Sequence, residues 1–353
     1  MKLILIFILT FHLCSKEVAC VQHKRWAAAL WFISAAALLL LSIGFAASYG
    51  AKELSLRTVW TAIFAYDDRL TSHQIIHDLR LPRVLGAALS GMAFGAAGAI
   101  MQAVTRNPLA DSGVLGINAG AAMAVALSFA FWPGLPYIQL MMLSFLGAAL
   151  STLAITGLAS LTPGGLTSLR LTIAGAVISA ILHSVTAGIA IYYALNQDLA
   201  FWYAGGVAGI GWSQLRLLAP VIVPALLLTL LMSRSITLMS LGEESAAGLG
   251  IRTSRVRLLG MGAAVLLAGA AVSAAGSIAF VGLVVPHIAR RLVGVTFAKV
   301  LPLSALLGAI LLVLADLAAR TVNPPREFAI GAMVAIIGVP FFLYLARKEG
   351  REL

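Results

Sequence analysis

Few side chains in this sequence could bind a metal ion or carry out catalysis, and those few stand far apart. His183 and His287 each lie in an apolar stretch, where an imidazole could bind a metal but more often hydrogen-bonds to its surroundings. Cys14 and Cys20 lie outside any cluster of metal-ligating residues. An integral-membrane enzyme would need His, Asp and Glu side chains on one face, and the sequence shows no such cluster. We therefore predict no metal site, no cofactor and no catalytic residue.

The polar residues that do form a pattern flank the apolar stretch 82–104. The run 79–83 reads L-R-L-P-R, so Arg80 and Arg83 would stand at the mouth of a helix that has a proline in its first turn. At the other end of this stretch the sequence places Gln102, Arg106, Asn107, Pro108 and Asp111. These residues would cap the helix, and Asp111 could N-cap the next one. Taken alone, the pattern is typical of a helix that ends at a membrane surface.

A second pattern is a short acidic segment bounded by glycines within the polar connector 233–257. Its characteristic residues are Gly242, Glu243, Glu244, Ser245, Ala246, Leu249 and Gly250. Acidic side chains near a helix N-terminus interact favourably with the helix dipole, which is one explanation. The other is a docking element for a soluble partner. The chain has no G-x-x-x-x-G-K-[ST] motif of its own, so any use of ATP would have to take place on another protein.

Two further motifs follow near the end of the chain. The segment 276–291 is apolar and glycine-rich until it reaches Pro286, His287, Arg290 and Arg291. The segment 316–342 begins with D-L-A-A-R, so Arg320 stands four residues after Asp316, and Glu327 follows. Proline inside an apolar helix should break or kink it, and this applies to Pro286 and to Pro340.

The elements that position these motifs follow from composition. Of the 353 residues 61% are hydrophobic and 10% are charged, and the mean hydropathy is +1.00. Soluble domains have roughly 25% charged residues, so a soluble globular fold is excluded. One membrane span needs about 20 apolar residues. The sequence therefore predicts an all-α polytopic membrane protein with about ten transmembrane helices and no separate soluble domain.

We expect one transmembrane domain at 26–353, preceded by a leader or interfacial segment at 1–25. A long polar stretch at 49–81 and a short amphipathic piece at 200–214 should interrupt the spans. The ten spans are expected at 26–48, 82–104, 114–131, 138–159, 169–195, 217–232, 258–274, 278–293, 301–319 and 328–346.

The net charge of +11 points to a membrane rather than to a nucleic-acid partner. Basic residues flank the first and last spans, and an even number of spans puts both ends of the chain on one side. The same side receives Arg106, the 233–257 connector, Arg290 and Arg291. We therefore expect both termini in the cytoplasm. Arg80 and Arg83 would then lie on the opposite side, together with the acidic residues of the 49–81 stretch, with Asp198 and with the turn from Asp316 to Glu327.

Together these four motifs resemble the FecCD/vitamin B12-type permease family, the membrane subunits of type II ABC importers for iron–siderophore, haem and cobalamin. The resemblance covers residue 26 to the end of the chain, in the order and spacing of the family. Ser112 stands where the family commonly has proline. The resemblance implies ten spans per subunit in a bacterial cytoplasmic membrane and a second permease subunit, identical or paralogous. It also implies a pair of cytoplasmic ATPases and an extracytoplasmic binding protein.

The resemblance also implies roles for single residues. Residues 243–250 match the coupling helix that sits in a cleft of the ATPase. Arg80, Arg83 and Arg320 match outward arginines that pair with glutamates of the binding protein. The alternative for these arginines is an ion pair with lipid phosphate.

The implied mechanism is alternating access without chemistry on the cargo. A ferric siderophore is favoured as cargo because it is the commoner substrate of such permeases, and haem or cobalamin is the alternative. A rival class is a secondary transporter driven by an ion gradient, which would need carboxylates inside the membrane. Asp316 and Glu327 lie at span ends, and no acidic residue is central in a predicted span. This argues against the rival.

Overall fold

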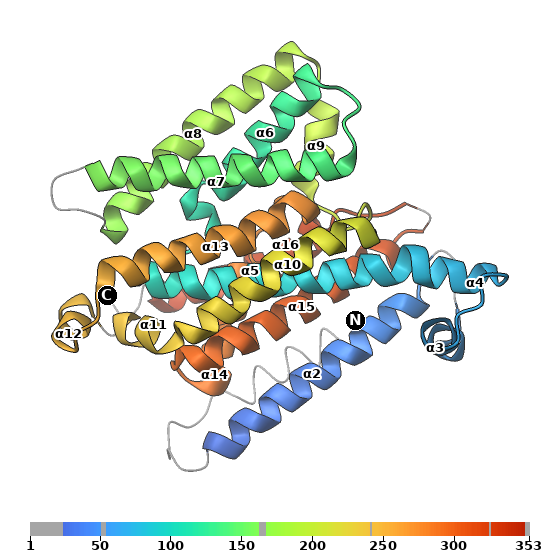
Figure 1. Ribbon diagram of the computed structural model, residues 1–353, viewed down its shortest axis with the longest axis horizontal. Coiled ribbons are helices and arrows are strands. Elements are labelled where there is room, and N and C mark those ends of the chain that lie inside the picture. Colours follow the sequence, from blue (N-terminus) through green and yellow to red (C-terminus); the bar gives the residue numbers. More distant parts are fainter. Residues whose placement is uncertain (1–23, 51–53, 162–166, 241, 325, 350–353) are drawn as a thin grey trace.

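The computed structural model describes residues 24–50, 54–161, 167–240, 242–324 and 326–349. All regular elements in these ranges are helical (Figure 1), which confirms the all-α prediction. Most of the 1–25 segment lies outside the described residues. In chain order the elements are α2 (Lys24–Ser48), α3 (Leu56–Phe64), α4 (Thr71–Gln74), the π-helix η1 (Ile75–Arg80), α5 (Leu81–Thr105), the 3₁₀-helix η2 (Ser112–Leu115), α6 (Ile117–Phe131), α7 (Tyr137–Leu161), α8 (Ser168–Tyr192), α9 (Asn196–Ala204), α10 (Trp212–Leu231), α11 (Ser233–Ser240), α12 (Glu243–Gly248), α13 (Thr253–Ala275), α14 (Val281–Val293), α15 (Phe297–Thr321) and α16 (Ile330–Glu349).

The described chain contains seven helices that are long and apolar enough to cross a membrane. They are α2, the continuous helix 71–105, α7, α8, α10, α13 and α15. Helix α6 and the apolar part of α16 are shorter. Helix α14 has 13 residues, which corresponds to about 20 Å, less than the roughly 30 Å of a hydrocarbon core. The polytopic membrane architecture is thus confirmed, whereas the number of ten spans stays a prediction.

Three stretches differ from what hydropathy predicted. The polar stretch 49–81 is not simply a connection, because it contains α3 and helical turns that run without a break into α5. The piece expected at 200–214 is the helix α9, and the segment 205–211 after it is not helical. Helices α14 and α16 continue through Pro286 and Pro340, so neither proline breaks its helix.

Helix α5 forms the centre of the bundle, and most of its residues are buried (Figure 1). Its glycines allow neighbouring backbones to approach closely, as in other membrane helix pairs. A Cβ atom at Gly91 or Gly95 would collide with the backbone of α15, and one at Gly98 would collide with the backbone of Gly282 on α14. Close backbone contact therefore joins α5 to the last third of the chain.

We name the two ends of the bundle after α5: the Arg83 end and the Arg106 end. The Arg83 end contains α3, α4, the last turns of α2 and α15, and the start of α16. The Arg106 end contains α11 and α12 (Figure 1). Since α2 ends and α16 begins at the Arg83 end, Lys24 and Glu349 both lie at the Arg106 end.

Candidate functional site

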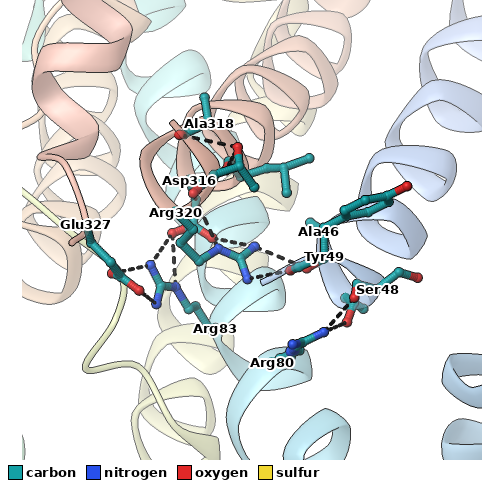
Figure 2. A network of polar contacts seen from close by, with 12 residues as sticks. Ala46, Ser48, Tyr49, Arg80, Arg83, Asp316, Ala318, Arg320 and Glu327 are labelled. Carbon is teal, nitrogen blue, oxygen red and sulfur yellow. Dashed lines mark hydrogen bonds and ion pairs between the residues drawn. The ribbon is translucent and has the colours of Figure 1, made fainter. Parts of the chain in front are cut away.

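Arg83, in the first turn of α5, binds two carboxylates from the far end of the sequence (Figure 2). Its Nε and Nη2 donate to Oδ1 of Asp316 at 3.0 and 2.9 Å. Its Nη1 and Nη2 donate to the two carboxylate oxygens of Glu327 at 2.9 and 2.8 Å. A planar guanidinium suits such paired contacts with carboxylates. Asp316 lies on α15, and Glu327 precedes α16, so Arg83 ties the start of α5 to both.

Two further arginines hold the end of α2. A helix ends with carbonyl groups that have no partner within it, and in a membrane such groups must be satisfied by protein. Arg80 Nη1 donates to two of these carbonyls at 2.9 and 2.6 Å, and Arg320 donates to two others at 3.1 and 3.3 Å. The four acceptors are consecutive, with Arg80 bonded to Ala47 and Ser48 and Arg320 to Ala46 and Tyr49 (Figure 2).

The members of this network differ sharply in exposure. The side chain of Asp316 is 1% exposed, and that of Arg320, 3.1 Å away, is 6% exposed. Arg83 is 14% exposed and Glu327 is 45% exposed. The hydrogen bond from Arg83 lowers the pKa of Glu327, which stays ionised at neutral pH. Asp316 is therefore a buried counter-ion, whereas Glu327 is the carboxylate that solvent or a partner can reach.

At the Arg106 end, Gln102 of α5 joins the motif that contains Pro286. Proline has no N–H, so Pro286 cannot donate to the carbonyl of Gly282 four residues earlier. The side-chain amide of Gln102 donates to this carbonyl at 3.1 Å and to that of Leu283 at 3.2 Å. Arg290 in turn donates to Oε1 of Gln102. The structure thus brings together two motifs that are far apart in the sequence.

The segment after α5 turns back into the bundle. Arg106 ends α5 in the left-handed conformation with a φ of 51°. Asn107 Oδ1 accepts from the backbone N–H of Leu109 at 3.0 Å, and Asp111 accepts from that of Ser112 at 2.6 Å. This confirms that Asp111 caps the next turn, although that turn is the 3₁₀-helix η2.

Asp111 also lies deeper than its place in the sequence suggests. A Cβ atom at Gly282 would lie 2.5 Å from its Oδ1, and Gly282 itself packs against Gly98 in the last third of α5. Hydropathy missed this acidic residue inside the bundle, because Asp111 belongs to a connection rather than to a span. It lies beside the first turn of α14, where a carboxylate interacts favourably with the helix dipole.

The acidic segment of the connector forms the short helix α12, as expected. Gly242 precedes it with a φ of 141°, which an L-residue rarely adopts. Ala246 is buried, and its carbonyl accepts from the N–H of Ile251 at 3.0 Å. Leu249 is 66% exposed. The side chains of Glu243 and Glu244 lie outside the described part of the chain.

Beside α12 a cavity of about 400 Å³ opens between α11 and the start of α15. Thr237 and Leu238 line it from α11, and Leu249 lines it from the end of α12. The Arg106 end therefore offers a concave, mostly apolar surface next to a short protruding helix.

The described residues contain no group of three His, Cys, Asp or Glu side chains that could hold a metal ion. The ring of His183 lies beside that of Tyr203, with 6.4 Å between the ring centroids, and the ring of His287 lies beside that of Phe341, with 5.7 Å between the centroids. The residues that sequence reasoning missed as partners are Asp316 and Glu327. Both were expected on the same side of the membrane as Arg83, and this was the sequence feature that could have indicated the ion pairs.

Apolar spans, a glycine-packed central helix and polar contacts confined to short motifs define a helical membrane protein of the transporter type. Residues 38–348 match the FecCD transport family, and the chain therefore belongs to this family.

Relatives and a solved structure agree with this membership. The chain is 49% identical to the iron(3+)-hydroxamate import system permease protein FhuB of Bacillus subtilis, over 94% of this chain and 86% of that protein. It is 38% identical to the hemin transport system permease protein HmuU of Yersinia pestis, over 89% and 94%. A metal-chelate type ABC transporter solved in an inward-facing conformation matches with a TM-score of 0.80 and 27% identity, over 91% of this chain and 99% of that one. The fold is that of an ABC importer permease subunit.

Proposed function

We propose that this chain is the permease subunit of an ATP-driven importer that carries a ferric siderophore through the bacterial cytoplasmic membrane. The observation that carries this proposal is its 49% identity, over 94% of the chain, to an iron(3+)-hydroxamate permease. The hemin permease is less similar, at 38%. This difference favours a hydroxamate-type iron complex over haem. Residues 26–353 act as one transmembrane domain that contains the connector 233–257.

The orientation we propose puts the Arg106 end in the cytoplasm. Basic residues concentrate there, on the connection after α5, on the connector and at the end of α14. Both the start of α2 and the end of α16 belong to this end. The termini are then cytoplasmic, and the Arg83 end faces the substrate-binding protein.

At the cytoplasmic end we propose that α12 is the coupling helix and that a pair of ATPases moves it. Its position next to an open, mostly apolar cavity supports this role, because a partner side chain could enter there. The second permease subunit is a copy of this chain or a paralogue. ATP binding between the partner ATPases would change the tilt of the two permease subunits, which gives alternating access.

At the Arg83 end we propose that a glutamate of the binding protein pairs with Arg83. Arg83 and Arg320 pair with two carboxylates, and Arg80, bonded to carbonyls of α2, adds a third guanidinium group, so this cluster has one positive charge more than it has carboxylates (3 − 2 = +1). Glu327 is the exposed carboxylate that an incoming one would displace. Arg80 and Arg320 are buried against α2, and they support the site by holding this helix in place.

Transport in vesicles tests the function. The chain is reconstituted with its second subunit, its ATPase and its binding protein, and uptake of a ferric hydroxamate is measured with ATP inside. We expect uptake that vanadate stops and that ionophores leave intact. Preferential uptake of haem under the same conditions would show that haem, rather than a ferric siderophore, is the cargo. Uptake driven by an ion gradient without the ATPase would overturn the proposal.

The role of α12 is tested by charge reversal. We expect the double change Glu243→Lys and Glu244→Lys to reduce co-purification of the ATPase, because it changes the helix that should enter the ATPase cleft. The control Asp198→Lys changes the charge of an exposed residue on α9. This helix belongs to the Arg83 end, because Gly205, directly after it, bonds Ile330 at the start of α16. Equal ATPase recovery in the double variant and the wild type would contradict the role.

A further inference from the structure

Helix α3, which hydropathy did not predict, has one broad apolar side, of which one part is buried and the other exposed. Val59 and Ala62 are buried in a small cluster with Ala47 of α2 and Ile76 of η1. The other part is exposed to an unusual degree for apolar side chains. It carries Leu56 (56% exposed), Trp60 (67%), Ile63 (43%) and Phe64 (69%). These positions, i, i+4, i+7 and i+8, form one stripe on a helix.

The helix lies level with the last turn of α2. Its buried face contacts Ala47, two residues before the start of the connection to α3. Figure 1 shows α3 nearly end-on at the edge of the bundle, so its axis crosses those of α2 and α5. An amphipathic helix that crosses the spans at their ends has the position of an interfacial helix.

The exposed stripe lies next to an exposed apolar surface of α2. Helix α2 is a candidate span of which only 22% is buried, so most of its apolar surface is exposed. Its exposed side includes Leu41 and Phe45, and the ring of Phe45 stacks on that of Tyr49 at 5.6 Å. A cavity of about 270 Å³ lies between α2 and α3, lined by Phe45, Ser48, Tyr49, Leu54, Ser55 and Leu56. The exposed apolar side chains of the two helices therefore meet at the edge of this cavity.

The chemistry of the stripe matches the boundary between headgroups and acyl chains. Trp60 and Phe64 pack ring to ring at 4.5 Å, and aromatic side chains are enriched at this depth. Arg57 is exposed next to the stripe, where it could bind lipid phosphate. We propose that α3 is an interfacial anchor that inserts Leu56, Trp60, Ile63 and Phe64 into the bilayer interface at the Arg83 end. It thereby holds η1, and with it Arg80, at a fixed height in the membrane.

A fluorescence experiment on the full chain tests this anchor. In a background with Cys14→Ser and Cys20→Ser, a fluorophore is attached at Trp60→Cys, at Phe64→Cys or at the control Asp68→Cys. Asp68 is exposed in the connection that follows α3. The labelled chains are reconstituted in vesicles of phosphatidylethanolamine and phosphatidylglycerol. Quenching is measured with aqueous iodide and with lipids that carry a doxyl group near the glycerol or near the chain end.

The proposal predicts that the doxyl group near the glycerol quenches both stripe positions more strongly than the group at the chain end. Iodide should quench the control position several-fold more than either stripe position, because the stripe lies below the headgroups. Equal iodide access at all three positions would overturn the proposal. So would iodide access at the stripe that is lost only when a binding protein is added, because the stripe would then be a protein-docking surface.

Discussion

At the two ends of α5, different kinds of side chain bond backbone carbonyls that have no partner within their own helix. At the Arg83 end, charged guanidinium groups bond the last carbonyls of α2, and they require the buried carboxylate of Asp316 as a counter-ion. At the Arg106 end, the neutral amide of Gln102 bonds the carbonyl that Pro286 leaves free on α14. Unpaired carbonyls are costly in lipid, so both devices meet the same demand.

The two ends differ in whether a group from another protein could replace one of their contacts. The Gln102 contacts are buried and involve backbone carbonyls of the same chain. The charged network ends in Glu327, which is 45% exposed and which we propose is displaced by a carboxylate of the binding protein. The Arg83 end is therefore suited to transient ionic contacts, and the Arg106 end is held by permanent ones.

The largest effect should follow Asp316→Asn. This change leaves Arg83 and Arg320 without their buried counter-ion, and loss of one partner from a buried ion pair costs about 3–5 kcal/mol. We expect a large drop in the temperature at which the protein in detergent loses its monodisperse peak. The control Asp68→Asn removes an exposed carboxylate and should leave that temperature unchanged. Wild-type stability of Asp316→Asn would show that the charged network is not needed at the Arg83 end.

A smaller effect should follow Gly98→Ala. The added methyl group collides with the backbone of Gly282, and overpacking of this kind costs about 1–3 kcal/mol. The matched control is Gly262→Ala on α13, where nothing lies within 4 Å of the added Cβ. There the better helix propensity of alanine should give a gain of up to about 1 kcal/mol. The same heating assay checks both, and equal behaviour of the two variants would contradict close α5–α14 packing.

Next in size is Gln102→Ala, which leaves the carbonyl of Gly282 without its donor. A buried acceptor without a partner costs about 1–3 kcal/mol. The carbonyl of Gly282 needs this donor because Pro286 has no N–H. The loss of stability caused by Gln102→Ala should therefore be smaller in a Pro286→Ala background, where a backbone N–H can bond that carbonyl. A double-mutant cycle of thermal stability measures the coupling. If the effects of the two substitutions on stability were additive, Gln102 would not be compensating for the N–H that Pro286 lacks.

How much of this architecture could be predicted differs from element to element. Long apolar runs gave helix bounds within a few residues, as at α7, expected at 138–159 and found at Tyr137–Leu161. Helix α14 was expected at 278–293 and found at Val281–Val293; its three-residue shortening was not predicted, because the apolar run from 278 has the same hydropathy whether it is extended or helical. Helix α3 was missed because its nine residues stand between polar neighbours.

The site was less accessible to sequence reasoning than the helices. The resemblance to the family grouped Arg80, Arg83 and Arg320, but nothing local shows that Arg83 binds residues 233 and 244 positions away. Such pairings depend on how helices pack. Whether Arg83 also meets a partner protein stays a prediction, as does the role of α12.

The smallest effect on stability, and the most informative for the contrast, should come from Glu327→Gln. Half-exposed ion pairs contribute about 0–1 kcal/mol, so the heating assay should barely change. The affinity for the loaded binding protein should rise about two- to fivefold, because Arg83 no longer has a competing carboxylate. Docking to the chain in nanodiscs measures this. The control Asp198→Asn makes the same change in charge on α9, at the same end of the molecule. An equal gain in affinity in both variants would mean that net charge matters rather than the release of Arg83.

The pH dependence of docking sharpens this prediction. The bond to Arg83 lowers the pKa of Glu327 from its ordinary value of 4.5. A carboxylate with a lowered pKa contributes its ion pair fully above the ordinary value and loses it as the pH falls through the lowered one. The difference in affinity between wild type and Glu327→Gln should therefore be constant from about pH 5.5 to pH 8 and shrink only in stronger acid. A difference that already disappears near pH 6 would mean that a group with a higher pKa controls docking, and Glu327 would then not be the carboxylate that a partner displaces.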